Sequence, residues 1–359
     1  MKIRGERDDL ADLFSRANRA VAARSALPVL QGLLCEAAAG TITVTGTDLE
    51  VTVTTAGPVE VMEEGRAVIP GRLLAEAVRK LPPGVVTITV TGGEVEILGK
   101  GPRFTLRTLA LDDFPNLDLS PVEGVEVDGE ELVNGLNQVV VAASSDSARP
   151  ILTGVLFEPA DEGLRLVTTD SYRLGIRDLP GMGSIGSGLV PARGLRELGR
   201  TIGAEKIRAG IAAREAVFAS ERGTLRLRLI EGSFPKYRTL FSDSYPVQVS
   251  MKREDILDAL GRVALVAEDH IPVRLNIGNG GIEVNVTRQD VGGEVEHLAA
   301  EFVGVDPITI AFNPRYLADG VGAINGDTVR IQIIDPLKAT VLDNGADDGF
   351  TYLLMPVRI

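Results

Sequence analysis

Three prolines recur at equal intervals of 122 residues along the chain: Pro28, Pro150 and Pro272. Each lies in a related phrase, which reads Arg24-Ser-Ala-Leu-Pro-Val-Leu, Ser147-Ala-Arg-Pro-Ile-Leu and Asp269-His-Ile-Pro-Val-Arg-Leu in turn. Each phrase leads into a stretch in which apolar residues alternate with others. A repeat of this length predicts one domain present three times, and it constrains the architecture before any single residue is interpreted.

Each repeat also begins with the pattern of a short strand followed by an amphipathic helix. Two apolar residues four positions apart recur near the start of every copy, at Leu10 and Phe14, Leu132 and Leu136, and Ile256 and Leu260. This spacing places both side chains on one face of a helix. Acidic residues crowd the predicted helix starts, where they suit the helix dipole: Asp8, Asp9, Glu130, Glu131, Glu254 and Asp255.

A second proline-containing phrase recurs downstream in each copy, and it has Arg72, Arg193 and Arg315 at the equivalent position. Proline before a helix-forming run is typical of a helix start, so second helices are predicted over 73–81, 195–202 and 316–324. Alternating stretches such as 41–45 and 224–229 predict strands. Phe114-Pro115, Phe234-Pro235 and Met355-Pro356 close the three copies.

The predicted fold class is therefore α+β, with three repeated domains that each pack two helices on antiparallel sheets. Boundaries near Pro121 and Ser244 divide the chain into domains 1–121, 122–244 and 245–359. Three unrelated α+β domains remain the alternative, although several sets of matching residues in one order argue against chance.

Composition narrows the class of protein. The net charge of −13 argues against a nucleic-acid binder on average, unless basic residues gather on one surface. No apolar run approaches the ~20 residues that span a membrane, and no signal-peptide core follows Met1. The single cysteine, Cys35, is expected to be a buried strand residue, and the cytosol is the expected compartment.

The sequence offers little catalytic chemistry. His270 and His297 are the only histidines, and both are interpreted as ordinary surface or strand residues. No cluster of histidine and cysteine predicts a metal site, and no Walker loop or Gly-x-Ser-x-Gly elbow occurs. We therefore expect no catalytic residues, no metal and no cofactor.

One glycine-rich motif requires a separate interpretation. Gly181-Met-Gly183-Ser-Ile-Gly186 matches the dinucleotide-binding fingerprint, which requires glycines between a strand and a helix. The residues that follow, up to Pro191, are typical of another strand. A flexible hairpin loop is the favoured interpretation, and a nucleotide-dependent enzyme is the alternative that the motif leaves open.

Several phrases, found together in this order, closely resemble one family along the whole chain. They are Thr45-Gly-Thr-Asp48-Leu-Glu, Thr168-Thr-Asp170-Ser-Tyr-Arg-Leu, Gly232-Ser-Phe-Pro-Lys-Tyr-Arg238, Phe312-Asn-Pro-Arg-Tyr-Leu and the tail Tyr352-Leu-Leu-Met-Pro-Val-Arg-Ile359. The family is the bacterial sliding clamp, the beta subunit of DNA polymerase III, and the composition resembles an actinobacterial member.

The resemblance implies a homodimer in which two three-domain subunits close head to tail into a ring of six domains around duplex DNA. Its implied partners are DNA without regard to sequence, the alpha subunit of the replicative polymerase, the clamp loader and other proteins with a clamp-binding motif. Residues implied at the dimer joint are Phe104, Leu106 and Leu265. A clamp paralogue with a specialised role, such as drug resistance, stays open as an alternative.

Helices line the central hole in this family, which reconciles DNA binding with the acidic total. The candidate DNA-facing residues are Arg24, Arg72, Arg79, Lys80, Arg149, Arg193, Arg196 and Arg200, with Arg16, Arg19 and Arg315 as further candidates. Pairing of these arginines with local carboxylates is the competing interpretation.

The resemblance also implies a peptide-binding pocket between the second and third domains. Its residues, carried over by position, are Leu152, Thr169, Ser171, Tyr172, Arg173, Leu174, Pro235, Thr239, Leu240, Asn313, Tyr316, Leu353, Met355, Pro356, Val357 and Arg358. Apolar walls would take a partner's leucine or phenylalanine, while polar groups would hold the peptide backbone. Tyr172 and Thr239 differ from some family members, which puts the ranking of peptides in doubt.

Overall fold

The structure is a computed structural model of the chain, and it describes residues 1–120, 123–267, 271–346 and 348–358. It divides into two compact units. The first unit comprises Met1–Val133 and Arg193–Leu229, and the second comprises Asn134–Ala192 and Ile230–Ile359. The domain boundaries near Pro121 and Ser244 stay predictions, and Pro121 and His270 lie outside the described residues.

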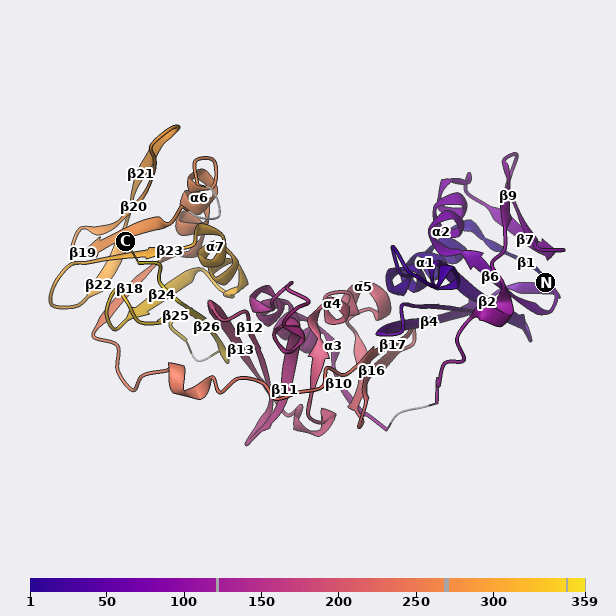
Figure 1. Cartoon of the computed structure of the whole chain (residues 1–359), viewed down its shortest axis with the longest axis horizontal. Coiled ribbons are helices and arrows are strands. Elements are labelled where there is room, and N and C mark those ends of the chain that lie inside the picture. The colour runs from indigo at the N-terminus through magenta and orange to yellow at the C-terminus, as the bar shows by residue number, and fades with distance from the viewer. Residues whose placement is uncertain (121–122, 268–270, 347, 359) are drawn as a thin grey trace. The chain divides into compact units, whose positions relative to one another are not determined.

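Two antiparallel sheets make up the strands of the first unit. The smaller has the order β5 (Glu60–Glu63), β1 (Lys2–Glu6), β7 (Val85–Thr91), β8 (Glu94–Leu98) and β9 (Arg103–Arg107). The larger has the order β10 (Val125–Asp128), β15 (Lys206–Ile211), β16 (Glu215–Ser220), β17 (Gly223–Arg228), β4 (Val51–Pro58), β3 (Thr41–Thr47), β2 (Gly32–Ala38) and β6 (Gly65–Pro70). Figure 1 shows β17 beside β4, and Leu225 lies opposite Val53 across that join.

The second unit is also built on two antiparallel sheets. The larger has the order β14 (Gly188–Pro191), β11 (Gly154–Ala160), β12 (Gly163–Thr169), β13 (Arg173–Pro180), β26 (Phe350–Leu354), β25 (Thr340–Asp343), β24 (Thr328–Ile333), β18 (Val247–Lys252) and β22 (Ala300–Val303). The smaller has the order β21 (Gly292–Leu298), β20 (Gly281–Arg288), β19 (Val273–Gly278) and β23 (Ile308–Phe312). Sheet pairing thus runs from one predicted repeat into the next, at β17–β4 and at β13–β26.

The predicted α+β class and the first helix of each repeat are confirmed. These helices are α1 (Arg7–Ala17), α3 (Gly129–Val139) and α6 (Arg253–Val263). The predicted apolar pairs are all buried: Leu10, Phe14, Leu132, Leu136, Ile256 and Leu260. The acidic residues lie in the first helical turn, as predicted from the helix dipole.

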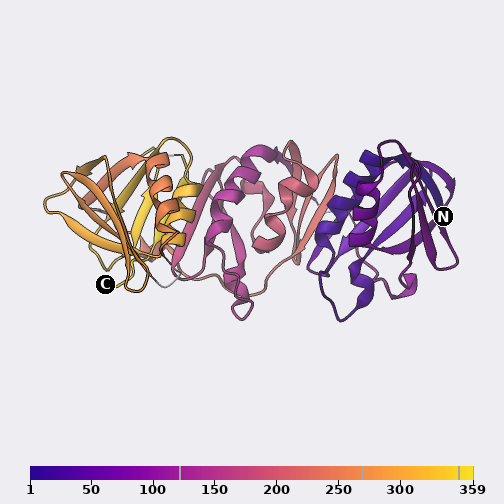
Figure 2. The same cartoon turned by 90° about the horizontal axis from the view of Figure 1, so that it is seen from above.

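The second helices are α2 (Gly71–Lys80) and α7 (Pro314–Ala323) in the first and third repeats. Figures 1 and 2 show that α2 packs beside α1, and α7 beside α6. The prediction of one continuous helix over 195–202 is wrong, because two short helices, α4 (Ala192–Leu195) and α5 (Leu198–Ile202), replace it. The N–H of Glu197 donates to the carbonyl of Gly194, three residues back, and this tighter turn interrupts the α-helical pattern.

The recurring prolines mark equivalent places in the fold. Pro28 and Pro150 each begin a single 3₁₀ turn, Pro28–Gln31 and Pro150–Thr153, directly before strands β2 and β11. Pro272 directly precedes β19 without such a turn.

Cys35 is fully buried in β2, as predicted, and burial raises the pKa of its thiol to about 12. None of the helices in the described part of the chain has the length and apolar character that crossing a bilayer requires.

Candidate functional site

A tight turn between β12 and β13 organises the predicted peptide site in the second unit. The hydroxyl oxygen of Thr169 accepts the N–H of Ser171 at 3.1 Å, and Asp170 Oδ1 accepts the N–H of Tyr172 at 2.9 Å and of Arg173 at 3.1 Å. Ser171 adopts a φ of +83°, a left-handed conformation in which few non-glycine residues occur. The turn leaves the Tyr172 side chain 57% exposed.

The buried guanidinium of Arg173 links this turn to helix α7. Its Nε donates to Asp170 at 2.9 Å, and its NH1 donates to Asp319 at 2.6 Å. The guanidinium also lies 4.2 Å from the centroid of the Tyr316 ring, on which Tyr172 stacks at 6.3 Å. Burial alone would lower the pKa of Arg173, but the surrounding oxygens outweigh it and raise that pKa, so the side chain stays charged.

Tyr352, on the neighbouring strand β26, fixes the position of α7. Its buried hydroxyl donates to the carbonyl of Tyr316 at 2.9 Å, and burial raises the pKa of this phenol. Gly320 of α7 faces the ring, since a Cβ there would lie 2.3 Å from Cε1 of Tyr352. The Asn313 side chain caps α7 by accepting the N–H of Tyr316 at 3.1 Å.

The C-terminal tail runs from β26 past the turn toward β23. The N–H of Met355 donates to the carbonyl of Tyr172, and the N–H of Val357 donates to the carbonyl of Ala311, each at 2.8 Å. Met355, Val357 and Arg358 are exposed and Pro356 is half-buried. The tail therefore runs beside the backbone of Tyr172 and leaves the apolar side chains of Met355 and Val357 exposed.

Two other predicted pocket residues lie on the opposite face of the same strands. Leu174 and Leu353 are paired in register and are each 1% exposed, because the segment 234–245 covers them. Leu152 is also buried. Pro235, Thr239 and Leu240 are exposed on the covering segment, whose Tyr237 donates its hydroxyl to Glu158 at 2.6 Å.

The structure thus brings together Thr169, Ser171, Tyr172, Arg173, Asn313, Tyr316, Met355, Pro356 and Val357, whereas Leu174 and Leu353 belong to the core beneath the other face. Asp319 and Tyr352 complete the arginine network but were not identified as site residues from the sequence. Asp319 could have been identified from its position three residues after Tyr316, because that spacing places both side chains on the same helix face.

The predicted DNA-facing residues are exposed, and many of them are paired with local carboxylates. Arg72 pairs with Glu76, Arg149 with Asp146, Arg193 with Asp48 and Arg200 with Glu197. Arg24, Arg79, Lys80, Arg196 and Arg315 are also exposed, and Arg19 pairs with Glu197. The expectation for Arg16 is wrong, because its side chain is buried between Asp12 and the carbonyl of Arg222.

Of the residues predicted at the dimer joint, Phe104 and Leu265 are exposed and Leu106 is half-buried. Phe104 and Leu106 are on β9, the outer strand of its sheet, and Phe104 is 36% exposed. Leu265 lies two residues after the end of α6 and is 85% exposed. β21 is the outer strand of the four-stranded sheet in the second unit.

The glycine motif at 181–186 does not precede a helix of the kind that binds a dinucleotide. It joins β13 to β14 through a 3₁₀ turn, Gly183–Ile185, with Met182 and Ile185 buried. The prediction that a strand follows is confirmed. The hairpin interpretation is wrong, because β14 pairs with β11 while β13 pairs with β12 and β26.

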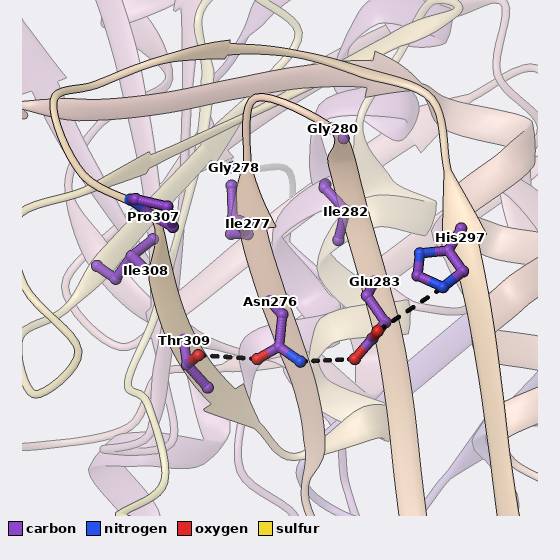
Figure 3. A pocket seen from close by; sticks show the side chains of 11 residues that line it. Asn276, Ile277, Gly278, Gly280, Ile282, Glu283, His297, Pro307, Ile308 and Thr309 are labelled. Atoms are coloured by element: carbon purple, nitrogen blue, oxygen red, sulfur yellow. Dashed lines mark hydrogen bonds and ion pairs between the residues drawn. The ribbon is translucent and has the colours of Figure 1, made fainter.

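A hollow of about 290 Å³ lies on the four-stranded sheet of the second unit, and Figure 3 shows the side chains that line it. A polar ladder crosses its floor: Thr309 donates to Asn276, Asn276 donates to Glu283, and His297 lies 3.7 Å from Glu283. The amides of Asn276 and Asn285 hold the pKa of Glu283 below its ordinary value. Within the described residues, no group of three or more potential metal ligands occurs. His297 is exposed on β21, as predicted.

Comparison with family models assigns almost the whole chain. The N-terminal, central and C-terminal domains of the DNA polymerase III beta subunit match residues 1–118, 126–236 and 238–358. The chain is 36% identical to the beta sliding clamp of Streptomyces coelicolor over the full length of both proteins. It is 31% identical to the beta sliding clamp homolog GriR of Streptomyces muensis, covering all of this chain and 99% of that one.

Solved structures of bacterial sliding clamps have the same fold. A clamp from Bartonella birtlesii bound to griselimycin matches with a TM-score of 0.92 at 26% identity, covering all of both chains. A clamp from Caulobacter crescentus matches with a TM-score of 0.91 at 27% identity, covering all of this chain and 99% of that one.

Proposed function

This chain belongs to the DNA polymerase III beta subunit family, the beta sliding clamps, and from that premise we propose that it encircles duplex DNA and tethers replication proteins to it. The observation that carries the proposal is the order of the three family models, which follow one another along the chain without a missing domain. The family consists of processivity factors and not of catalytic enzymes, so the chain is no enzyme.

The proposed working form is a head-to-tail dimer, a ring of six domains. Edge strand β9 of one copy joins edge strand β21 of the other, which removes two exposed sheet edges. Their charges are complementary, since Arg103 and Arg107 lie on β9 whereas Glu294 and Glu296 lie on β21. Apolar side chains accompany them, with Phe104 on β9 and Val295, 62% exposed, on β21.

Glu294 adds a specific argument for this joint. Partial burial and the neighbouring Glu296 raise the pKa of its carboxyl, and its buried Oε2 has no hydrogen-bond partner among the described residues. A buried carboxylate oxygen without a donor is costly. An arginine of a second copy would supply both the donor and the positive charge.

DNA is proposed to be held by topology and by weak contacts to phosphate. Exposed cations such as Arg24, Arg79 and Lys80 offer such contacts without reading base sequence. Arg72 and Arg149 exchange a local carboxylate for a phosphate at little cost, because ion pairs at exposed sites contribute about 0–1 kcal/mol. Contacts of this strength let the protein move along the duplex.

Partner proteins, such as the polymerase alpha subunit and the clamp loader, are proposed to dock at the surface formed by Tyr172, Tyr316, Met355, Pro356 and Val357. The exposed ring and the apolar tail suit a leucine or phenylalanine of a short peptide. The buried network around Arg173 supports this surface from below, so the site is positioned before a peptide arrives.

The test uses the full chain loaded by a clamp loader onto nicked circular DNA. The protein should elute at about twice 38.1 kDa, stay with the circle at high salt, and be lost when the circle is cut once. Equal retention on circular and linear DNA would contradict the proposal, because binding would then come from affinity and not from encirclement.

The similarity to GriR keeps a specialised clamp paralogue as a second candidate. The two roles separate in one experiment, in which this gene is the only clamp gene of an actinobacterial host. Growth at the normal rate supports the general replicative role, whereas failure of a well-expressed protein supports the paralogue.

A further inference from the structure

We propose that a hollow in the first unit binds a tyrosine side chain of a partner polypeptide, at the place where the second repeat buries its own Tyr237. The hollow has a volume of about 350 Å³, and Leu34, Glu36, Thr45, Arg66, Phe114 and Leu117 are among its lining residues. We refer to it as the Leu117 hollow. It lies on other elements than the proposed peptide site, and it extends the proposed function by a second docking point.

Strand register shows which positions of the two repeats are equivalent. Leu34 of β2 lies opposite Thr45 and Val68, just as Leu156 of β11 lies opposite Val167 and Leu189. It follows that Glu36, two residues after Leu34, is the equivalent of Glu158. Both repeats then continue through a Phe-Pro pair, Phe114-Pro115 and Phe234-Pro235, so Leu117 stands where the second repeat has Tyr237.

In the second repeat, the phenol of Tyr237 fills the equivalent place. Its ring is 4% exposed and packs in a cluster with Val167, and the half-buried Leu156 lies against that cluster. Its hydroxyl donates to Glu158 at 2.6 Å, and Arg238 pairs with the same carboxylate at 2.8 Å. The site therefore consists of apolar walls, one carboxylate acceptor and one guanidinium.

The first repeat keeps a carboxylate, a guanidinium and part of the apolar wall, and it lacks the phenol. Thr45 and Thr54 stand where the second repeat has Val167 and Ile176, so this part of the wall is more polar. Arg66 pairs with Glu36 at 2.7 Å, as Arg238 does with Glu158, and Leu34 and Phe114 supply the apolar walls. Leucine at position 117 has neither the ring nor the hydroxyl. The five tyrosines of the chain, at 172, 237, 245, 316 and 352, all belong to the second unit, so the first unit has none to offer.

The equivalence with the Tyr237 site thus indicates that a tyrosine of another polypeptide is the occupant of the Leu117 hollow. The volume of the hollow lies within the range of small-ligand sites. A tyrosine contributes a rigid ring to the walls and a hydroxyl donor to a charged acceptor, which is the stronger kind of hydrogen bond. An isolated side chain should bind weakly, in the millimolar range, because few of its atoms make contact.

The experiment follows leucine methyl signals by NMR in the full-length protein while N-acetyl-L-tyrosinamide is added. We expect saturable shifts at Leu34 and Leu117, and about tenfold weaker binding of N-acetyl-L-phenylalaninamide, which lacks the donor to the carboxylate. The peptide Gly-Gly-Tyr-Gly-Gly should bind at least as tightly as the tyrosine amide. Binding of the free amide without binding of the peptide would overturn a polypeptide partner.

Variants of the chain sharpen the test. Leu117→Tyr should fill the hollow from within and abolish the shifts at Leu34, and Glu36→Gln should remove the preference for tyrosine over phenylalanine. Tyr237→Leu should open a matching hollow in the second repeat, with new shifts at Leu156. Absent shifts at Leu34, shifts that persist in Leu117→Tyr, or equal affinity for both amides would each overturn the proposal. If Leu117→Tyr fails to fold, the affinities of the tyrosine and phenylalanine amides for the parent chain and for Glu36→Gln test the proposal instead.

Discussion

The guanidinium of Arg173 lies 4.2 Å over the ring of Tyr316, and the same side chain binds the carboxylates of Asp170 and Asp319. Arg173 begins a strand of the second repeat, whereas Tyr316 and Asp319 belong to a helix of the third. One buried cation thus joins two repeats directly beneath the proposed peptide surface. Its removal should affect both stability and binding.

Arg173→Ala should lower the free energy of unfolding of the second unit by about 3 kcal/mol, because Asp170 would remain buried without its cation. Urea denaturation followed by circular dichroism measures this change. The matched control is Arg149→Ala, whose pair with Asp146 is about half exposed on both sides. We expect a change of less than about 0.5 kcal/mol there, and equal effects of the two variants would contradict the buried network.

Gly320→Ala should destabilise the chain, because the new methyl group would lie 2.3 Å from the buried ring of Tyr352. We expect a loss of about 1–3 kcal/mol, typical of an overpacked core. Gly322→Ala, in the same helix, meets nothing within 4 Å and should stabilise the chain by about 0.5 kcal/mol. Thermal unfolding of both variants measures the contrast, and the same sign for both would show that the ring is not held where it lies.

Glu158 should contribute a pH-dependent stability. Partial burial raises the pKa of its carboxyl, but Tyr237 and Arg238 outweigh burial and hold that pKa below the ordinary value. A lowered folded-state pKa means that the contribution is present above the unfolded value of about 4.3 and is lost as the pH falls through the folded value. Glu158→Gln should therefore be less stable than the parent chain at pH 7, and the difference should shrink below about pH 4. A difference that stays constant down to pH 3 would contradict the assignment.

Met355→Ala, in a chain shortened to end at Val357, should weaken the binding of a fluorescent peptide that carries adjacent leucine and phenylalanine. A reduction of at least about tenfold is expected if Met355 forms part of the apolar wall. Fluorescence anisotropy measures the affinity, and gel filtration should show an unchanged dimer. Unchanged affinity would remove Met355 from the proposed surface.

The sequence predicted the repeated elements because periodicity reports burial directly. Leu10 and Phe14 recur as Leu132 and Leu136, and a helix with that spacing must bury one face. The joins between repeats could not be predicted in the same way. The pairing of Arg173 with Leu354 depends on two strands far apart in the sequence, and no local pattern specifies such a register.

The family resemblance identified the candidate site residues, but it did not predict which of them are buried. Leu174 and Leu353 have the apolar character of a pocket wall, yet Tyr237 and its neighbours cover them. Alternation along a strand tells which residues share a face, but it does not tell which face a later segment will cover. The burial of Arg16 could not be predicted either. Its guanidinium donates to the carbonyl of Arg222, which is far away in the sequence, and the local sequence of such an arginine does not differ from that of an exposed one.

The join between β4 and β17 has a consequence for how the protein is made. Val53 is translated long before Leu225, its partner across the join. At about 5–20 residues per second, the ribosome needs roughly 10–30 s to supply the missing strand. During that time the nascent first repeat exposes the unpaired edge of β4 to neighbouring chains. Co-expression with a chaperone that covers nascent strands should therefore raise the yield of native protein.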